Sequence, residues 1–152
     1  MPYAAPNRVN DFVIKIGTVN GTGSASANGL LMKAVFRSGV PVVGKNYFPS
    51  NIQGLPTWYE IRVTRDGHRA RSGQVDVMVA LNPETYARDL QEVTSGGYFF
   101  YDSTWPRPAL LQMRDDVTVL GAPLARMCNE TFNGARTRIL MNVGNPDEAF
   151  RL

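Results

Sequence analysis

The sequence is poor in the residue types that build metal and redox sites. Its 152 residues include one cysteine, Cys128, and one histidine, His68. A disulfide within the chain, a cysteine-ligated cluster and a CxxC zinc site are therefore excluded. A serine-histidine-aspartate triad would have to use His68, which sits in the turn-like segment RDGHRAR. The residues thus predict no catalytic group and no metal site belonging to this chain alone.

Long apolar runs and strong charge are also missing. No run approaches the ~20 apolar residues that cross a bilayer, and the N-terminal MPYAAPNRVND lacks the apolar core of a signal peptide. The net charge is only +3, and the basic segment at residues 62–71 lacks the aromatic residues of a single-strand-binding platform. We expect a cytoplasmic protein without membrane or nucleic-acid partners, with residues 1–10 as a flexible tail.

Strand-like and helix-like patterns alternate along residues 11–152. The expected strands cover residues 12–17, 40–48, 57–63, 75–81, 96–103 and 117–123, and the expected helices cover 24–38, 82–93 and 123–132. The nearly continuous apolar run at 75–81 is typical of a strand buried on both faces of a parallel sheet. The alternation predicts a single α/β domain with a Rossmann-like open sheet, mostly parallel, and helices on both faces.

A glycine-rich loop, GTVNGTGS at residues 17–24, joins the first expected strand to the first helix. Such a loop can hold a phosphate at the helix N-terminus, where backbone N–H groups are free. The third glycine of the dinucleotide fingerprint is replaced by Ser26, Lys45 stands where an acidic residue is expected, and the Walker lysine is missing after Gly23. The loop is therefore either a tight turn that packs helix on strand or the border of an anionic ligand.

Four residues of this loop and one later residue are candidate ligand contacts. Thr22 or Ser24 is expected to cap the helix at 24–38, and Gly39 to end it. Asn82 is expected to cap the next helix, near the glycine loop, because the carboxyl ends of parallel strands share one edge. The candidates are Gly21, Thr22, Gly23, Ser24 and Asn82.

The segment KNYFPSNIQGLPTWYE, residues 45–60, is too apolar for a freely solvated connection. Apolar loops with a few neutral polar side chains form partner interfaces or line pockets. The alternative is a loop folded over its own core. The candidate contacts in this segment are Phe48, Ser50, Asn51, Gln53, Gly54 and Trp58.

Several segments together resemble one protein family over residues 11–141. They are IKIGTVNGTGSASANGLLMKAVFRSG, VGKNYFPSNIQGLPTWYEIRV, VDVMVALNPETYARDL, GGYFFYDST and VLGAPLARMCNETF. They resemble the gamma domain of 2-oxoacid:ferredoxin (acceptor) oxidoreductases, and most of all the N-terminal part of the alpha subunit of the 2-oxoglutarate type. The segment FPSNIQGLPTWYEIRV is the most specific part of the likeness.

The resemblance implies a non-catalytic part of an enzyme that converts a 2-oxoacid to an acyl-CoA and passes electrons to ferredoxin or another acceptor. Thiamine diphosphate, magnesium and the iron–sulfur cluster would belong to a pyrimidine-binding domain and a beta subunit. Gly21, Thr22, Gly23 and Ser24 would border coenzyme A, and Ser50, Asn51, Gln53 and Gly54 would face the shared active site or the partner. A stand-alone binding module for coenzyme A or another phosphate, or an interaction protein with no redox role, is the alternative.

Family alpha subunits of this type continue for several hundred residues, whereas this sequence ends at Leu152. The resemblance therefore implies a C-terminally truncated gamma-type domain at residues 11–152. It could be a fragment, a split-gene subunit or a divergent stand-alone protein, without oxidoreductase activity alone.

Overall fold

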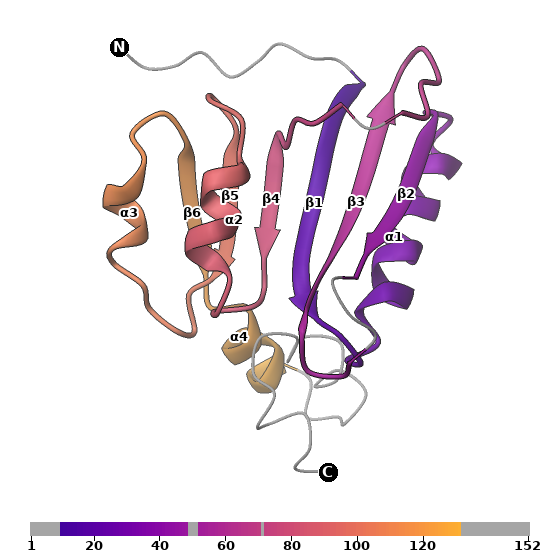
Figure 1. Cartoon of the computed structure of the whole chain (residues 1–152). Helices are drawn as coiled ribbons and strands as arrows, with labels where there is room; N and C mark the ends of the chain where they lie inside the picture. Colours follow the sequence, from indigo (N-terminus) through magenta and orange to yellow (C-terminus); the bar gives the residue numbers. More distant parts are fainter. Residues whose placement is uncertain (1–9, 49–51, 71, 132–152) are drawn as a thin grey trace.

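A computed structural model describes residues 10–48, 52–70 and 72–131, and these form one layered α/β unit (Figure 1). The tail expected at residues 1–10 lies almost wholly outside the described residues. The strands are β1 Asp11–Val19, β2 Val42–Tyr47, β3 Pro56–Thr64, β4 Val77–Ala80, β5 Tyr98–Asp102 and β6 Thr118–Ala122. The helices are α1 Ser24–Arg37, α2 Tyr86–Glu92, α3 Leu110–Met113 and α4 Leu124–Thr131.

The six strands form one mixed sheet in the order β2-β3-β1-β4-β5-β6. Strands β1, β4, β5 and β6 run parallel, while β3 pairs antiparallel with both β1 and β2. Ile14 lies opposite Ile61 on one side and Val77 on the other, which fixes the register around the central strand β1. The mostly parallel α/β sheet expected from the sequence is confirmed.

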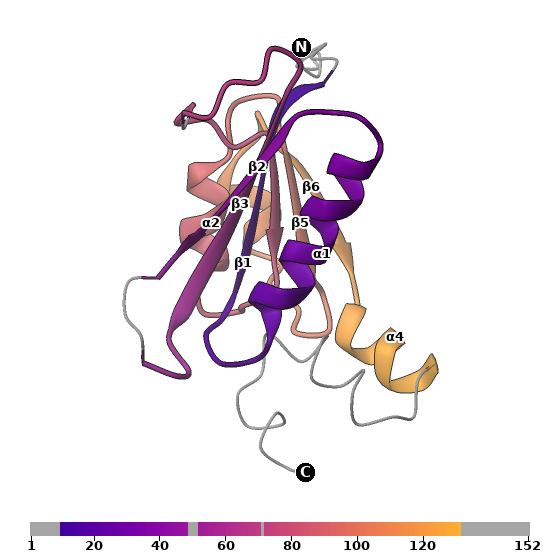
Figure 2. The same ribbon diagram turned by 90° about the vertical axis from the view of Figure 1, so that its right-hand side faces the viewer.

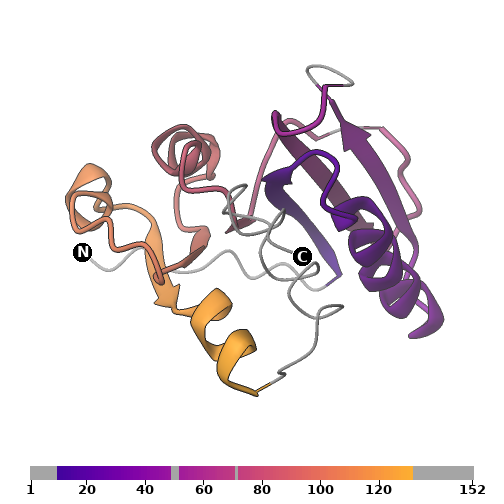
Figure 3. The same ribbon diagram turned by 90° about the horizontal axis from the view of Figure 1, so that it is seen from below.

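Helices cover both faces of this sheet, as predicted (Figures 2 and 3). Because side chains alternate along a strand, neighbouring residues of β1 serve opposite faces. Ile16 packs with Ile61 and Val63 on the α1 side. Met78 and Phe99 pack with Leu90 of α2 on the other side, where α3 adds Leu110.

The buried face of one strand, β4, differs from the prediction. Strand β4 is fully buried only toward α2, whereas Val77 and Val79 are half-buried. The prediction of burial on both faces is thus wrong for the described residues, because α1 packs over β1, β2 and β3 instead. Helix α1 turns Asn28 inward while Leu30 is 69% exposed.

Candidate functional site

The glycine loop leaves β1 at Val19 and enters α1 at Ser24 through two left-handed glycines. Gly21 has φ 87° and Gly23 has φ 78°, a region that favours glycine because it carries no Cβ. A Cβ on Gly21 would lie 2.5 Å from Cγ of Gln53. The loop conformation therefore depends on both glycines.

The amino end of α1 is capped differently from the prediction. Gly23 is the N-cap residue, and no side chain of the described residues caps the helix. Thr22 Oγ1 donates to the Val19 carbonyl over 2.7 Å, and Ser24 Oγ accepts from Thr18 Oγ1 over 2.9 Å. Both hydroxyls are thus turned back toward β1, and Gly39 follows the end of the helix as expected.

The two loops selected from the sequence lie together. The Asn20 N–H donates to the Leu55 carbonyl over 2.8 Å, and the Gly54 N–H donates to the Asn20 carbonyl over 3.0 Å. The Asn20 side chain also donates to the Ile52 carbonyl. Gln53 and Gly54 are therefore held against the glycine loop, while Ser50 and Asn51 lie outside the described residues.

Asn82 is 2% exposed at the carboxyl end of β4. Its Oδ1 accepts from the Glu84 N–H over 3.1 Å, and its Nδ2 has no hydrogen-bond partner among the described residues. The prediction that Asn82 caps α2 is wrong, because the chain makes a turn first and Thr85 is the N-cap.

The two aromatic candidates of the second loop have opposite environments. Phe48 is 48% exposed, whereas Trp58 is 4% exposed beneath α2. Trp58 Nε1 donates to Asp89 Oδ1 over 2.8 Å, and Thr85 Oγ1 donates to Asp89 Oδ2 over 2.7 Å. Burial raises the pKa of the Asp89 carboxyl, an effect that these two hydrogen bonds oppose.

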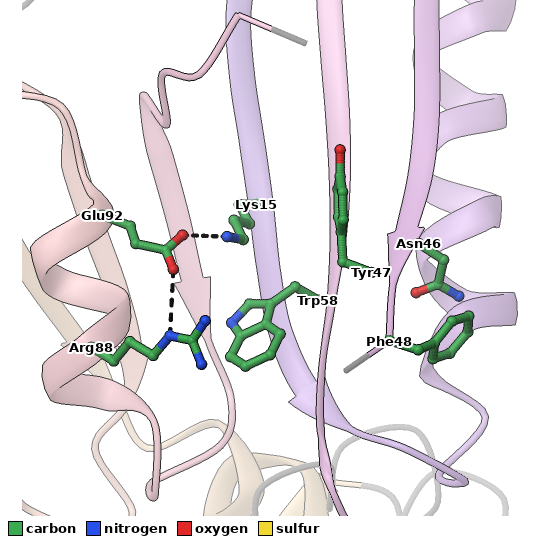
Figure 4. A pocket seen from close by; sticks show the side chains of 7 residues that line it. All are labelled: Lys15, Asn46, Tyr47, Phe48, Trp58, Arg88 and Glu92. Atoms are coloured by element: carbon green, nitrogen blue, oxygen red, sulfur yellow. Dashed lines mark hydrogen bonds and ion pairs between the residues drawn. The ribbon is translucent and has the colours of Figure 1, made fainter. Parts of the chain in front are cut away.

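A charged groove opens beside Trp58, between the sheet and α2 (Figure 4). Its volume is about 620 Å³. Lys15 from β1 and Arg88 from α2 both pair with the carboxylate of Glu92, the Arg88 contact being 3.6 Å. The Arg88 guanidinium lies 4.6 Å from the centre of the Trp58 ring. The residues that line the groove are Lys15, Asn46, Tyr47, Phe48, Trp58, Arg88 and Glu92.

The sequence reasoning found Phe48 and Trp58 of this groove but missed its charged residues. Lys15 carries a signal, because it is a charge in the middle of the apolar strand FVIKIG. Arg88 and Glu92 carry a weaker signal, the i, i+4 spacing that places them on one helix face. Lysine and arginine side chains such as these can form charge-assisted hydrogen bonds with a carboxylate or phosphate.

No group of three or more metal-binding side chains occurs in the described part of the chain. None of the described helices is long and apolar enough to cross a membrane.

The sheet order and the loop after β1 define an open α/β domain with a glycine-rich turn at the carboxyl end of its first strand. The sequence model of the pyruvate ferredoxin/flavodoxin oxidoreductase family matches residues 13–144. The chain belongs to this family, and the resemblance inferred from its sequence is confirmed.

A curated relative and several solved structures are similar to the chain. The alpha subunit of 2-oxoacid:ferredoxin oxidoreductase 2 from Aeropyrum pernix is 28% identical over 81% of this chain, which spans only 18% of that relative. The pyruvate oxidoreductase subunit PORC from Thermotoga maritima superimposes with TM-score 0.69 at 14% identity, over 88% of this chain and 71% of that one.

A second structure is 2-oxoglutarate:ferredoxin oxidoreductase from Magnetococcus marinus, with 2-oxoglutarate, coenzyme A and succinyl-CoA bound. It matches 81% of this chain and 22% of its own at 24% identity, with TM-score 0.70. The gamma subunit of a keto/oxoacid ferredoxin oxidoreductase from Geobacter sulfurreducens matches 86% of this chain and 70% of its own at 17% identity, with TM-score 0.61. At these identities the structures establish the shared fold.

Proposed function

We propose that this chain is a non-catalytic, gamma-type part of a 2-oxoacid:ferredoxin oxidoreductase that forms an acyl-CoA. The observation that carries the proposal is the family match over residues 13–144. The Aeropyrum pernix relative is named as an alpha subunit of such an enzyme, which supports the same assignment. The Magnetococcus marinus neighbour favours 2-oxoglutarate as the substrate of the whole enzyme.

Within the complex, the glycine loop would lie on the coenzyme A side of the active site. Helix α1 has 14 residues and no side-chain cap, so its first N–H groups are suited to a phosphate. Residues 21–24 would hold the ligand through backbone N–H groups, because the Thr22 and Ser24 hydroxyls already bond within the chain. Coenzyme A would supply the thiol that accepts the acyl group.

Asn82 would help to shape the same edge of the sheet. It follows β4, which is the parallel neighbour of β1, and the Leu81 N–H donates to the Gly17 carbonyl over 2.9 Å. Its buried Nδ2 is a donor without a partner among the described residues. A buried amide of this kind gains from a ligand oxygen or a water molecule within reach.

The loop between β2 and β3 would meet the partner subunit. Its exposed apolar side chains, Phe48, Ile52 and Leu55, are costly to leave in water and suited to a protein interface. Hydrogen bonds from residues 54 and 20 fix this loop to the glycine loop. Docking of a partner would therefore also hold the coenzyme A side of the site.

The proposal assigns the remaining cofactors to partners. Thiamine diphosphate with its magnesium ion would be held by a pyrimidine-binding domain and a beta subunit, and the iron–sulfur cluster by a partner chain. Electrons would leave through ferredoxin or another acceptor, in a reducing cytoplasm. This chain would orient coenzyme A and support assembly.

The first test is a gentle pull-down of the chain from its native cells, with a visible absorption spectrum and identification of the bound proteins by mass. We expect a brown complex that contains thiamine-binding and cluster-binding chains. A colourless protein without partners would contradict the subunit assignment and favour a stand-alone binding module.

The second test is a coenzyme A titration of the assembled enzyme. Gly23→Val forces a branched side chain into a left-handed position, and we expect it to weaken coenzyme A binding by at least tenfold. Gly29→Val on α1 is the matched control, because among the described residues no atom beyond the helix's own backbone lies within 4 Å of a Cβ there. Equal affinities of the two variants would remove the glycine loop from the coenzyme A site.

A further inference from the structure

The charged groove beside Trp58 is separate from the glycine loop. Lys15 and Trp58 face α2, whereas the glycine loop leads into α1 on the opposite face of the sheet (Figures 2 and 4). The volume of the groove, about 620 Å³, falls within the range of small-molecule sites. We propose that this groove binds a small organic anion, a phosphate or carboxylate of metabolite size, with Arg88 as the contacting cation.

The charges of the groove are unbalanced. Among the described residues that line the groove there are two cations, Lys15 and Arg88, and one carboxylate, Glu92, with which both cations pair. The Lys15 side chain is 7% exposed, and its ammonium group is committed to Glu92. The Arg88 side chain is 66% exposed, so it is the cation that an arriving ligand can reach.

Arg88 is held in an orientation that suits a ligand. Its guanidinium lies 4.6 Å from the centre of the Trp58 ring, and its Nε lies 3.6 Å from the Glu92 carboxylate. A guanidinium over an aromatic face keeps the N–H donors at its edge available. Those donors form a fork that matches two oxygens of a carboxylate or phosphate. The ring contact also reduces the rotamer entropy that binding would cost.

Trp58 is itself fixed, which makes the support rigid. Its Nε1 donates to the buried Asp89, and Asp89 lies on the same helix as Arg88. A positioned cation over a fixed ring is preorganised for binding. The floor of the groove continues over Tyr47, which pairs with Trp58 across β2 and β3. The ligand would therefore lie over Tyr47, with its charge toward Arg88.

Glu92 acts as the internal counter-ion of this site. Its carboxylate holds the position between Lys15 and Arg88 that an external anion would approach. A ligand anion must therefore work against the field of Glu92. Neutralising Glu92 should tighten binding, whereas removing the charge of Arg88 should weaken it.

The test is a titration of the full chain with three probes: pyrophosphate, adenosine 5′-diphosphate and 2-oxoglutarate. Binding is followed by calorimetry and by the fluorescence of Trp58 in a Trp105→Phe background. We expect Arg88→Gln to weaken binding of the preferred probe by about tenfold or more, since a charge-assisted contact is lost. Glu92→Gln should tighten binding several-fold.

Arg126→Gln is the matched control, because Arg126 forms a comparable exposed i, i+4 pair with Glu130 on α4. It changes the net charge as Arg88→Gln does but is not among the residues that line the groove, so it should leave the affinity unchanged. Preference for pyrophosphate or the nucleotide would identify a phosphate ligand, and preference for 2-oxoglutarate a carboxylate. If Glu92→Gln does not fold, the comparison of the two arginine variants decides.

Equal losses of probe affinity in Arg88→Gln and Arg126→Gln would overturn the proposal, because they would show a general effect of net charge. Absence of binding by all three probes would also overturn it. Gly23→Val separates this site from the proposed coenzyme A loop. Groove binding should survive that variant, and loss of binding would place the probe at the loop instead.

Discussion

Trp58 of β3 donates its indole N–H to Asp89 of α2 over 2.8 Å, which ties the antiparallel part of the sheet to the helix. Asp89 is fully buried and accepts a second hydrogen bond from Thr85. Gly17 of β1 lies against both partners, since a Cβ there would be 2.8 Å from Asp89 Oδ2. One carboxyl thus joins β1, β3 and α2 at the side of the groove.

This carboxyl should make stability fall as pH rises. Burial raises the pKa of Asp89 above its ordinary value of 3.8. Between the ordinary and the raised pKa, the folded state therefore binds more protons than the unfolded state. The free energy of unfolding decreases as pH rises through this window and is then constant. Asp89→Asn should remove this slope, as measured by urea unfolding from pH 3 upward.

The asparagine variant can keep both hydrogen bonds. Thr85 Oγ1 lies 3.2 Å from the Asn82 carbonyl, so the hydroxyl can donate there and accept from the new amide. Asp89→Leu is the control, because it leaves the Trp58 N–H unpaired at a cost of about 1–3 kcal/mol. An unchanged pH slope in Asp89→Asn would contradict the assignment of the titration to Asp89.

Gly17 should not tolerate a methyl group. Gly17→Ala would place its Cβ 2.8 Å from Asp89 Oδ2 and 3.2 Å from Trp58 Nε1, and the packed network leaves little room to yield. We expect a loss of about 1–3 kcal/mol in the free energy of unfolding. Gly29→Ala on α1 meets nothing within 4 Å and should stabilise by about 0.5–1 kcal/mol. Denaturant unfolding would measure both, and a Gly17→Ala variant that is no less stable than the parent chain would sink the packing argument.

Most of the elements were predictable from sequence because their signals are local, but the short helix α3 was not predicted. An apolar run marked β1, aromatic and β-branched residues marked β3, and Gly39 marked the end of α1. The sheet order was not predictable, since the position of β3 between β1 and β2 depends on pairing between distant segments. The caps were misjudged because the Thr22 and Ser24 hydroxyls bond to strand β1 rather than to the helix.

The two candidate sites also differed in how well the sequence predicted them, because their residues lie at different separations along the chain. The glycine loop could be found because its residues are adjacent in the sequence. The groove could not, since Lys15 and Glu92 lie 77 residues apart and meet only when α2 packs over β1. A lone lysine in an apolar strand signals a buried partner, but the sequence does not identify that partner as Glu92.

Arg114 should control the acidity of Asp116. Arg114 Nε donates to Asp116 Oδ1 over 2.7 Å, and this bond is the main reason that the Asp116 pKa is lowered to about 2. Arg114→Met should return that pKa toward 3.8, as measured by an NMR titration of the carboxyl group. Stability linked to Asp116 is present above its ordinary pKa and is lost as pH falls toward 2. Between pH 4 and 2, Arg114→Met should therefore lose less stability than the parent chain does.

Arg65→Met is the control for this titration, because Arg65 pairs with Asp66 on an exposed turn and leaves Arg114 intact. The Asp116 titration should be the same in Arg65→Met as in the parent chain. A low Asp116 pKa that persists in Arg114→Met would show that Ser95, its other hydrogen-bonding neighbour, is sufficient.

The Lys15–Glu92 pair should be coupled far more strongly than an exposed pair. The Lys15 side chain is 7% exposed and that of Glu92 is 28% exposed. Glu92→Gln leaves a buried ammonium without this carboxylate, whereas Lys15→Met leaves Glu92 with Arg88 at 3.6 Å. Glu92→Gln should therefore lower the free energy of unfolding more than Lys15→Met does. In the double variant, Lys15→Met should offset much of the stability lost through Glu92→Gln.

A double-mutant cycle by denaturant unfolding measures this coupling. We expect about 1–3 kcal/mol for Lys15–Glu92. The reference cycle uses Arg126 and Glu130, an exposed i, i+4 pair at 3.9 Å, for which about 0.3–0.5 kcal/mol is expected. Equal couplings in the two cycles would mean that Lys15 is solvated in solution, and that the charge balance inferred for the groove is wrong. A large coupling would establish that Glu92 is held by Lys15, as required of an internal counter-ion.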